Sequence, residues 1–307
     1  MTRSDTRNQR STGGMPIAGG QIRAIVLLVI TGTMIAGMLA SAGAARSAGA
    51  GTLATVVWQA LGGGTVLALI ALPSRPQVNR TLLTYGLLSG LTAIAIPNLM
   101  LFWLLAEISA GRVATALAAT PVMTALIAWA WQRKPLGGLG WAGVAVGTGG
   151  VALLTGAGTE GAMPLYALLV LVLVALSLSF GNVYRTVKWP EGASVATLAA
   201  AMKLCVGIPL ALVLLTTDPA AIVPGPGALP SAAAMVAFSV LAYLAFFALQ
   251  RHGGPVVLSM VGGVIALVGG MADWFIAGIP PGIGFVPGLA LLAVGIVLVS
   301  RRPNANA

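Results

Sequence analysis

Long uninterrupted apolar runs dominate this chain and limit the structures that it can form. Each run is about 18 to 25 residues long, close to the roughly 20 residues that a helix needs to cross the hydrocarbon core of a bilayer. A helix satisfies its own backbone hydrogen bonds in lipid, whereas transmembrane strands would be shorter and would alternate apolar with polar residues. The sequence therefore predicts an all-α integral membrane protein with ten transmembrane helices. The ten runs are 22–44, 51–72, 81–105, 112–131, 138–156, 164–184, 194–216, 231–250, 255–277 and 283–300.

The composition agrees with a chain that faces lipid. Hydrophobic residues make up 58% and charged residues 7% of the 307 positions, and the mean hydropathy is +0.99. A soluble domain carries roughly 25% charged residues to cover its surface. The net charge of +10 does not indicate nucleic-acid binding, because the basic residues stand in short loops rather than in one cluster. Since Cys205 and His252 are single, we expect no disulfide framework, no zinc site and no cofactor.

The basic residues predict how the spans are oriented. If the N-terminus is cytoplasmic and ten spans alternate, 13 of the 16 Lys and Arg residues fall on the cytoplasmic side, and Arg46 and Arg112 fall on the other. Membrane proteins concentrate positive charge in their short cytoplasmic loops. We therefore expect a polar cytoplasmic tail at residues 1–20 and two cytoplasmic termini. A cleavable signal peptide remains an alternative, although the first run is longer than the usual 7–15 apolar residues. The 13 residues are Arg3, Arg7, Arg10, Arg23, Arg75, Arg80, Arg133, Lys134, Arg185, Lys188, Arg251, Arg301 and Arg302.

The two halves of the chain show a weak internal repeat. A shift of 142 residues places Ala54-Thr55 over Ala196-Thr197 and Gly111 over Gly253. Each copy would hold five helices, so the second copy must be inverted in the membrane. Inverted repeats are typical of secondary transporters, whose substrate site lies near the midplane between the copies. We expect one five-helix repeat over residues 21–158 and the other over 159–307.

Two long stretches carry a resemblance to a known family. They are GRVATALAATPVMTALIAWAWQRKPLGGLGWAGVAVGTGGVALL at 111–154 and ALQRHGGPVVLSMVGGVIALVGGMADWFIAGIPPGIGFVPGLALLAVGIVLV at 248–299, and FGNVYRTVKWP at 180–190 adds to them. The chain resembles EamA-type members of the drug/metabolite transporter superfamily, which are built as ten helices in two inverted repeats. The resemblance implies a multi-pass protein of a bacterial inner membrane. Many relatives have Gly-Glu where this chain has Gln132-Arg133 and Gly278-Ile279.

Two charged residues lie inside predicted spans and are candidates for function. Lys203 lies about 13 Å from the cytoplasmic end of the seventh span, at 1.5 Å per residue. A lysine at this depth faces a cavity or a partner, which favours contact with an anionic substrate group or a proton-linked gate. Snorkelling of its long stem to the headgroups is the alternative. Asp273, in the ninth span, is the candidate for proton coupling, or it is an interfacial acid beside Trp274.

Uncharged polar and aromatic residues form a second set of candidates. Such side chains line transport cavities and orient a small ligand between apolar walls. An isolated Ser or Thr more often bonds to its own helix backbone or to a neighbouring helix. The candidates for substrate binding in this set are Asn98, Trp103, Thr120, Tyr243 and Ser259.

These observations predict a secondary transporter that works by alternating access through a central cavity. The resemblance implies export of small metabolites such as amino acids. Its partners would be a small-molecule substrate and membrane lipids, in a monomer or homodimer. No Gly-x4-Gly-Lys-Ser/Thr loop for ATP is present. A flippase for lipids or polyprenyl carriers is the main alternative, followed by a channel. A membrane enzyme is less consistent, because nucleophile–base pairs are lacking in the apolar runs.

Overall fold

Every element in the part of the chain that the structure describes is helical. The computed structural model describes residues 17–104, 120–133, 137–154, 164–277 and 282–300. Six helical segments of these ranges are long and apolar enough to cross a membrane. They are Gly20–Ser47, Thr52–Ser74, Arg80–Leu101, Leu165–Val187, Val195–Thr217 and Leu229–Ser259, and Gly138–Leu153 and Phe285–Val299 are shorter apolar helices. The prediction of a helical, multi-pass membrane protein is confirmed, whereas the count of ten spans stays a prediction.

The helices follow the predicted apolar runs closely. The second and third runs form composite helices, each interrupted by one π-helical segment. The elements of the first half are α1 (Ile17–Ser47), α2 (Thr52–Val57), η1 (Trp58–Gly62), α3 (Gly63–Ala71), η2 (Leu72–Ser74), α4 (Arg80–Gly90), η3 (Leu91–Ala95), α5 (Ile96–Leu104), α7 (Thr120–Gln132) and α8 (Gly138–Leu154). Those of the second half are α9 (Leu165–Val187), α10 (Val195–Thr217), η4 (Pro219–Ile222), α11 (Leu229–Ser259), α12 (Val261–Ala277) and α13 (Phe285–Ser300).

Polar residues at the helix starts explain where several spans begin. The side chain of Asn79 accepts a hydrogen bond from the backbone N–H of Leu82 at 2.9 Å and caps α4. Ser194 caps α10 in the same way, by accepting from the N–H of Thr197 at 3.1 Å. Such caps satisfy N–H groups that the first helical turn leaves without partners. The loops therefore fix the ends of the apolar segments.

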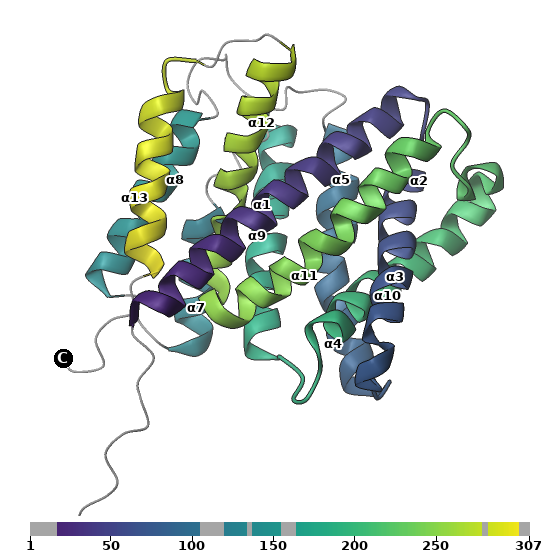
Figure 1. The fold of residues 1–307 in the computed structure, drawn as a ribbon, viewed down its shortest axis with the longest axis horizontal. Coiled ribbons are helices and arrows are strands. Elements are labelled where there is room, and N and C mark those ends of the chain that lie inside the picture. The colour runs from purple at the N-terminus through teal and green to yellow at the C-terminus, as the bar shows by residue number, and fades with distance from the viewer. Residues whose placement is uncertain (1–16, 105–119, 134–136, 155–163, 278–281, 301–307) are drawn as a thin grey trace, which may run out of the picture.

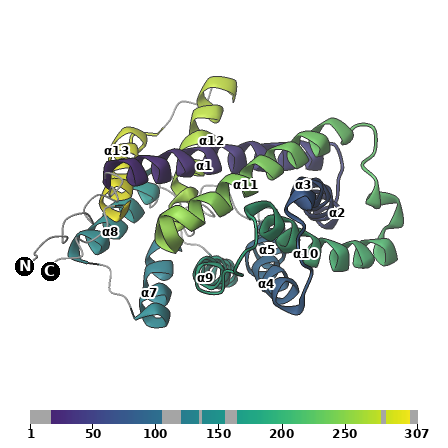
Figure 2. The same cartoon turned by 60° about the horizontal axis from the view of Figure 1, so that its bottom comes forward.

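Long helices cross the molecule and bring distant parts of the sequence together. Figure 1 shows α1 lying along α11, and α13 beside α8 at one end of the molecule. Figure 2 shows α9 end-on, between α7 and the composite helix of α4 and α5. At the other end, α10 packs against α3 and α4. The termini of the described chain are thus held by helices from the opposite half.

The long helix α11 contains a break that separates two of the predicted spans. Gly254 has a φ of 74°, and Pro255 follows it. Only glycine adopts this conformation without strain, and proline cannot continue the hydrogen bonding of the preceding turn. Arg251 and His252 are exposed beside the break. The predicted runs 231–250 and 255–277 therefore meet at this turn.

The structure corrects one assignment of the sequence analysis. Arg185 was counted among the cytoplasmic loop residues, but it lies in α9 and its side chain is fully buried. The helix extends three residues beyond the predicted run, to Val187, and carries the arginine into the protein interior. The predicted 112–131 run lies partly outside the described residues, as does most of the 1–20 tail.

Helices α8 and α13 make one of the closest contacts in the molecule. A Cβ atom added at Gly150 would lie 2.5 Å from the backbone N of Leu292 and 2.8 Å from the carbonyl O of Gly288. A Cβ added at Gly295 would lie 2.5 Å from the Cα of Gly147. Small residues allow such backbone contact, which replaces the hydrophobic driving force that helices lack in lipid.

We expect Gly150→Ala to destabilise the protein and its neighbour Gly149→Ala to leave it intact. The added methyl group at position 150 would meet backbone of α13, and overpacking of this kind costs about 1–3 kcal/mol. Nothing lies within 4 Å of a Cβ at Gly149, so alanine there gains helix propensity only. Thermal unfolding in detergent checks this pair. Equal melting temperatures for the two variants would contradict the contact.

Candidate functional site

Lys203 lies where helices from both halves of the chain meet. Its side chain is fully buried in α10. The Nζ atom donates a hydrogen bond to the backbone carbonyl of Gln59 at 3.2 Å. It also lies 4.1 Å from the centroid of the Tyr243 ring, a cation–π contact with α11. The ammonium therefore points into the protein interior and does not reach towards the headgroups, as snorkelling would require.

Gln59 extends this polar cluster into the first half of the chain. Its side chain is 2% exposed, and its Oε1 accepts a hydrogen bond from Asn98 Nδ2 at 3.1 Å. Its Nε2 contacts the Met38 sulfur at 2.9 Å. Sequence analysis missed Gln59, although a single amide in the middle of an apolar run is a signal that could have found it. We call Lys203, Gln59, Asn98, Tyr243 and Ser239 the central cluster.

The central cluster keeps polar groups with unused bonding capacity. Ser239 is fully buried in α11, and its Oγ has no hydrogen-bond partner in the described structure. A Cβ added at Gly63 would lie 2.9 Å from that oxygen and 3.4 Å from Lys203 Nζ. Because position 63 is a glycine, the Ser239 hydroxyl and the Lys203 ammonium can approach α3 closely. A lysine ammonium has three donors, and one of them is used by Gln59.

The Gln59 carbonyl that accepts from Lys203 lies in a π-helical segment. Segment η1 covers Trp58–Gly62, and a similar segment, η3, covers Leu91–Ala95 in the next composite helix. π-helical turns are rare and occur frequently at functional sites. The Gln59 carbonyl also accepts from the backbone N–H of Gly63, so it bonds to its own helix and to the lysine at the same time. No sequence pattern predicted these two segments.

Three other predicted site residues have described partners that do not belong to the central cluster. The Thr120 carbonyl accepts from Ser179 Oγ at 3.2 Å, and Ser259 Oγ donates to the carbonyl of Val256 at 2.6 Å. The Trp103 side chain is 49% exposed and packs against Tyr166. The structure thus brings together Lys203, Asn98 and Tyr243, and leaves these three elsewhere. The predicted coupling residue Asp273 belongs to α12, and its side chain lies outside what the structure describes.

A second buried cation lies near the C-terminal end of α9. Arg185 donates from Nε to Gln250 Oε1 at 3.2 Å and from Nη2 to Asn182 Oδ1 at 2.6 Å. Its Cζ lies 5.0 Å from the centroid of the Phe246 ring. The Gln250 amide also donates to the Asn182 carbonyl at 2.8 Å and to Thr186 Oγ1 at 3.0 Å. We call Arg185, Asn182, Gln250 and Thr186 the arginine cluster.

The two clusters are linked through aromatic residues of α11. Tyr243 and Phe246 are one helical turn apart, with ring centroids 5.6 Å from each other. Lys203 contacts the first ring and Arg185 the second. Neither cation pairs with a carboxylate in the described part of the chain, where the acids with described side chains, Glu191 and Asp218, are exposed. The interior therefore holds positive charge balanced only by neutral groups.

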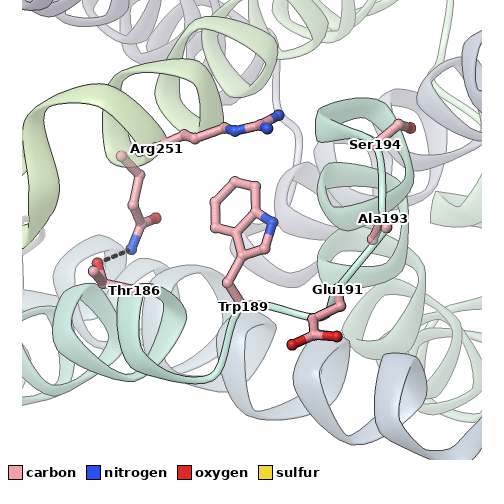
Figure 3. Close-up of a pocket in the computed structure, with 8 residues that line it drawn as sticks. Thr186, Trp189, Glu191, Ala193, Ser194 and Arg251 are labelled. Atoms are coloured by element: carbon pink, nitrogen blue, oxygen red, sulfur yellow. Dashed lines mark hydrogen bonds between the residues drawn. The ribbon is translucent and has the colours of Figure 1, made fainter. Parts of the chain in front are cut away.

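A cavity of about 530 Å³ reaches the arginine cluster from the surface. Gln250 donates a hydrogen bond to Thr186 at the edge of this cavity. Figure 3 shows Arg251 extending past the Trp189 indole. The lining residues are Thr186, Trp189, Glu191, Gly192, Ala193, Ser194, Gln250 and Arg251. They come from the end of α9, the connection between α9 and α10, and the turn of α11 that precedes its break. Gln250 thus faces the cavity and holds Arg185. No group of three metal-binding side chains occurs among the described residues.

Comparisons with known proteins agree with this architecture. Residues 23–156 match the model of the EamA-like transporter family. A solved crystal structure superposes with a TM-score of 0.72, covering 92% of this chain and 96% of the other at 15% identity, which shows a shared fold. No curated protein matches the chain significantly. The apolar helical spans and this family match indicate a multi-pass membrane protein that is similar to transporters of small solutes. Over residues 23–156 the family match bears out the resemblance to EamA-type transporters found in the sequence.

We expect Lys203→Met to leave the protein as stable as the wild type or more stable. A cation in the membrane interior costs on the order of 2.5–3.5 kcal/mol, and here no carboxylate in the described structure offsets it. The matched control is Met202→Ala at the adjacent, fully buried position, where truncation costs about 2–5 kcal/mol. The melting temperatures of the two variants in detergent are compared with that of the wild type. If Lys203→Met lowers the melting temperature as much as Met202→Ala does, the lysine contributes to stability.

Proposed function

We propose that the protein is a secondary transporter that exports small metabolites such as amino acids by alternating access around the central cluster. The observation that carries the proposal is the complete burial of Lys203 at a junction of helices from both halves. A buried charge is rare inside a membrane and marks a substrate or ion pathway. The lysine is suited to hold the carboxylate that every amino acid carries.

The contact between α10 and the second span supports two inverted repeats. A Cβ added at Gly207 of α10 would meet Ala60 and Leu61, and one added at Gly64 would meet Leu204 and Lys203. Under the shift of 142 residues, Leu61 corresponds to Lys203. The two equivalent helices therefore cross at equivalent positions. A pseudo-two-fold axis between inverted copies produces this kind of crossing, and transporter sites lie at such an interface.

The burial of the site supports alternating access. Lys203 has no exposure in this conformation, so a substrate reaches it only when helices around it separate. The break at Gly254 and the π-helical segments η1 and η3 supply irregular backbone beside the two clusters. Irregular backbone at membrane depth is tolerated where it is buried in protein or lines a water-filled cavity. We assign the coupling of protons to Asp273, as the acid of α12.

We expect Lys203→Leu to lose about tenfold or more of its initial transport rate for amino acids. Loss of a hydrogen bond to a charged group costs about 1.5–3 kcal/mol, and 1.4 kcal/mol corresponds to a factor of ten. The assay measures uptake and efflux of an amino-acid panel in proteoliposomes, with and without a pH gradient. The control is Lys188→Leu, since this lysine is exposed. If Lys203→Leu transports every amino acid of the panel at the wild-type rate, Lys203 does not bind the substrate.

We also propose that both termini are cytoplasmic and that the protein resides in a bacterial inner membrane. The test uses single cysteines at Ser4 and at Asn304 in a Cys205→Ala background. An impermeant thiol reagent added to intact cells should leave both cysteines unlabelled and should label both after the membrane is opened. Labelling of one terminus in intact cells would place the two ends on opposite sides and contradict the even number of spans.

A further inference from the structure

The arginine cluster contains an uncompensated positive charge besides that of Lys203. The partners of Arg185 are the amides of Gln250 and Asn182 and the Phe246 ring, all of them neutral. A guanidinium keeps its proton under all conditions that proteins meet. Burying a charge without an opposite charge is expensive, so buried cations in proteins usually have a carboxylate partner. A negative charge supplied by a ligand would complete this site.

Arg185 also has a free hydrogen-bonding group. Its Nη1 is buried and has no hydrogen-bond partner in the described structure. That atom lies beside Gly181, where an added Cβ would be 2.9 Å from it. The fixed fork of an arginine matches the two oxygens of a carboxylate, and here one arm of the fork is unused. A structural tie between α9 and α11 needs only the bond from Arg185 to Gln250, which is already made.

The two cations contact neighbouring aromatic rings of α11, and Arg185 lies nearer to the surface cavity through its bond to Gln250. The cavity in Figure 3 is lined by Gln250 and Thr186, and Gln250 bonds directly to Arg185. Beyond Arg185 the Phe246 and Tyr243 rings lead to Lys203. A solute that enters through the cavity would meet the guanidinium first and the ammonium second. The position of Arg185 behind the cavity wall distinguishes it from an ordinary packing residue.

We propose that Arg185 is a second anion-binding residue and that the preferred substrates carry two carboxylates, as acidic amino acids and small dicarboxylic acids do. This inference rests on the proposed function and narrows it to a substrate class. One carboxylate is held by Lys203 and the other by Arg185, with Ser239 and Asn98 available to neutral polar groups of the solute. Bringing both carboxylates to their cations requires the rearrangement that opens the arginine cluster.

The test compares solutes that differ by one carboxylate and little in size. Aspartate is paired with asparagine, and succinate with succinamate, in proteoliposome transport of the wild type, Arg185→Gln, Arg185→Lys and the exposed-site control Lys188→Gln. We expect the wild type and Lys188→Gln to prefer the dicarboxylate of each pair by about tenfold. Arg185→Gln should reduce this preference to about twofold while it retains transport of asparagine. Arg185→Lys keeps the charge and should keep most of the preference.

Two results would overturn the inference. Equal transport of both members of each pair by the wild type would exclude the dicarboxylate class. A uniform fall for all solutes in Arg185→Gln, with the ratio unchanged, would make Arg185 a structural tie between α9 and α11. Thermal unfolding of each purified variant with aspartate or asparagine supplies a second measurement that does not depend on transport. Stabilisation of the wild type by aspartate alone, lost in Arg185→Gln, supports the site even where no transport occurs.

The same experiment separates this inference from the proposed function. Transport of neutral or singly charged amino acids without preference would support the transporter and overturn the dicarboxylate site. Specific stabilisation by aspartate without transport would support the site and count against the transporter. If none of the four solutes is transported and none stabilises the protein, both the proposed function and the dicarboxylate site are overturned.

Discussion

The contact of Lys203 with Gln59 and Tyr243 is the constraint around which the rest of the structure is arranged. An ammonium inside the membrane must be surrounded by polar or aromatic groups, since lipid offers none. Here they come from η1 and α11, which belong to opposite halves of the chain. In the proposed mechanism, the lysine therefore lies where the two halves separate to admit a solute. One buried charge joins the packing of the helices to the proposed movement of a substrate.

Close packing of small residues sets the geometry in which that charge is held. Gly63 and Gly64 let the second span approach α10, and Gly207 lets α10 approach Leu61. In lipid, helices associate by van der Waals contact and by a few interhelical hydrogen bonds. A pair of surfaces without bulky side chains can also slide with little obstruction. The same glycines thus serve stability in one conformation and leave room for another.

The two π-helical segments and the break at Gly254 show how irregular backbone gathers near the buried cations. Segment η1 provides the carbonyl for Lys203, and the side chain of Thr92 in η3 lies against Gly181, beside Arg185. The break follows Gln250 by four residues, and Gln250 and Arg251 just before it line the surface cavity. Departures from the regular helix leave groups that other helices can use. Local irregularity and functional polarity therefore coincide in this protein.

The amino-acid sequence determined the helical spans, because their length and hydropathy follow from the bilayer alone, and it determined the caps at Asn79 and Ser194 through local chemistry. It also singled out Lys203, since a charge in an apolar run has few explanations. Only the tertiary structure decided that Asn98 reaches the site through Gln59, that Trp103 is half exposed, and that Arg185 is buried. These facts depend on which face of each helix meets another helix, and near-uniform apolar runs carry no periodicity that would reveal it. In such a chain, the bilayer fixes the helices and the packing of their small residues fixes the site.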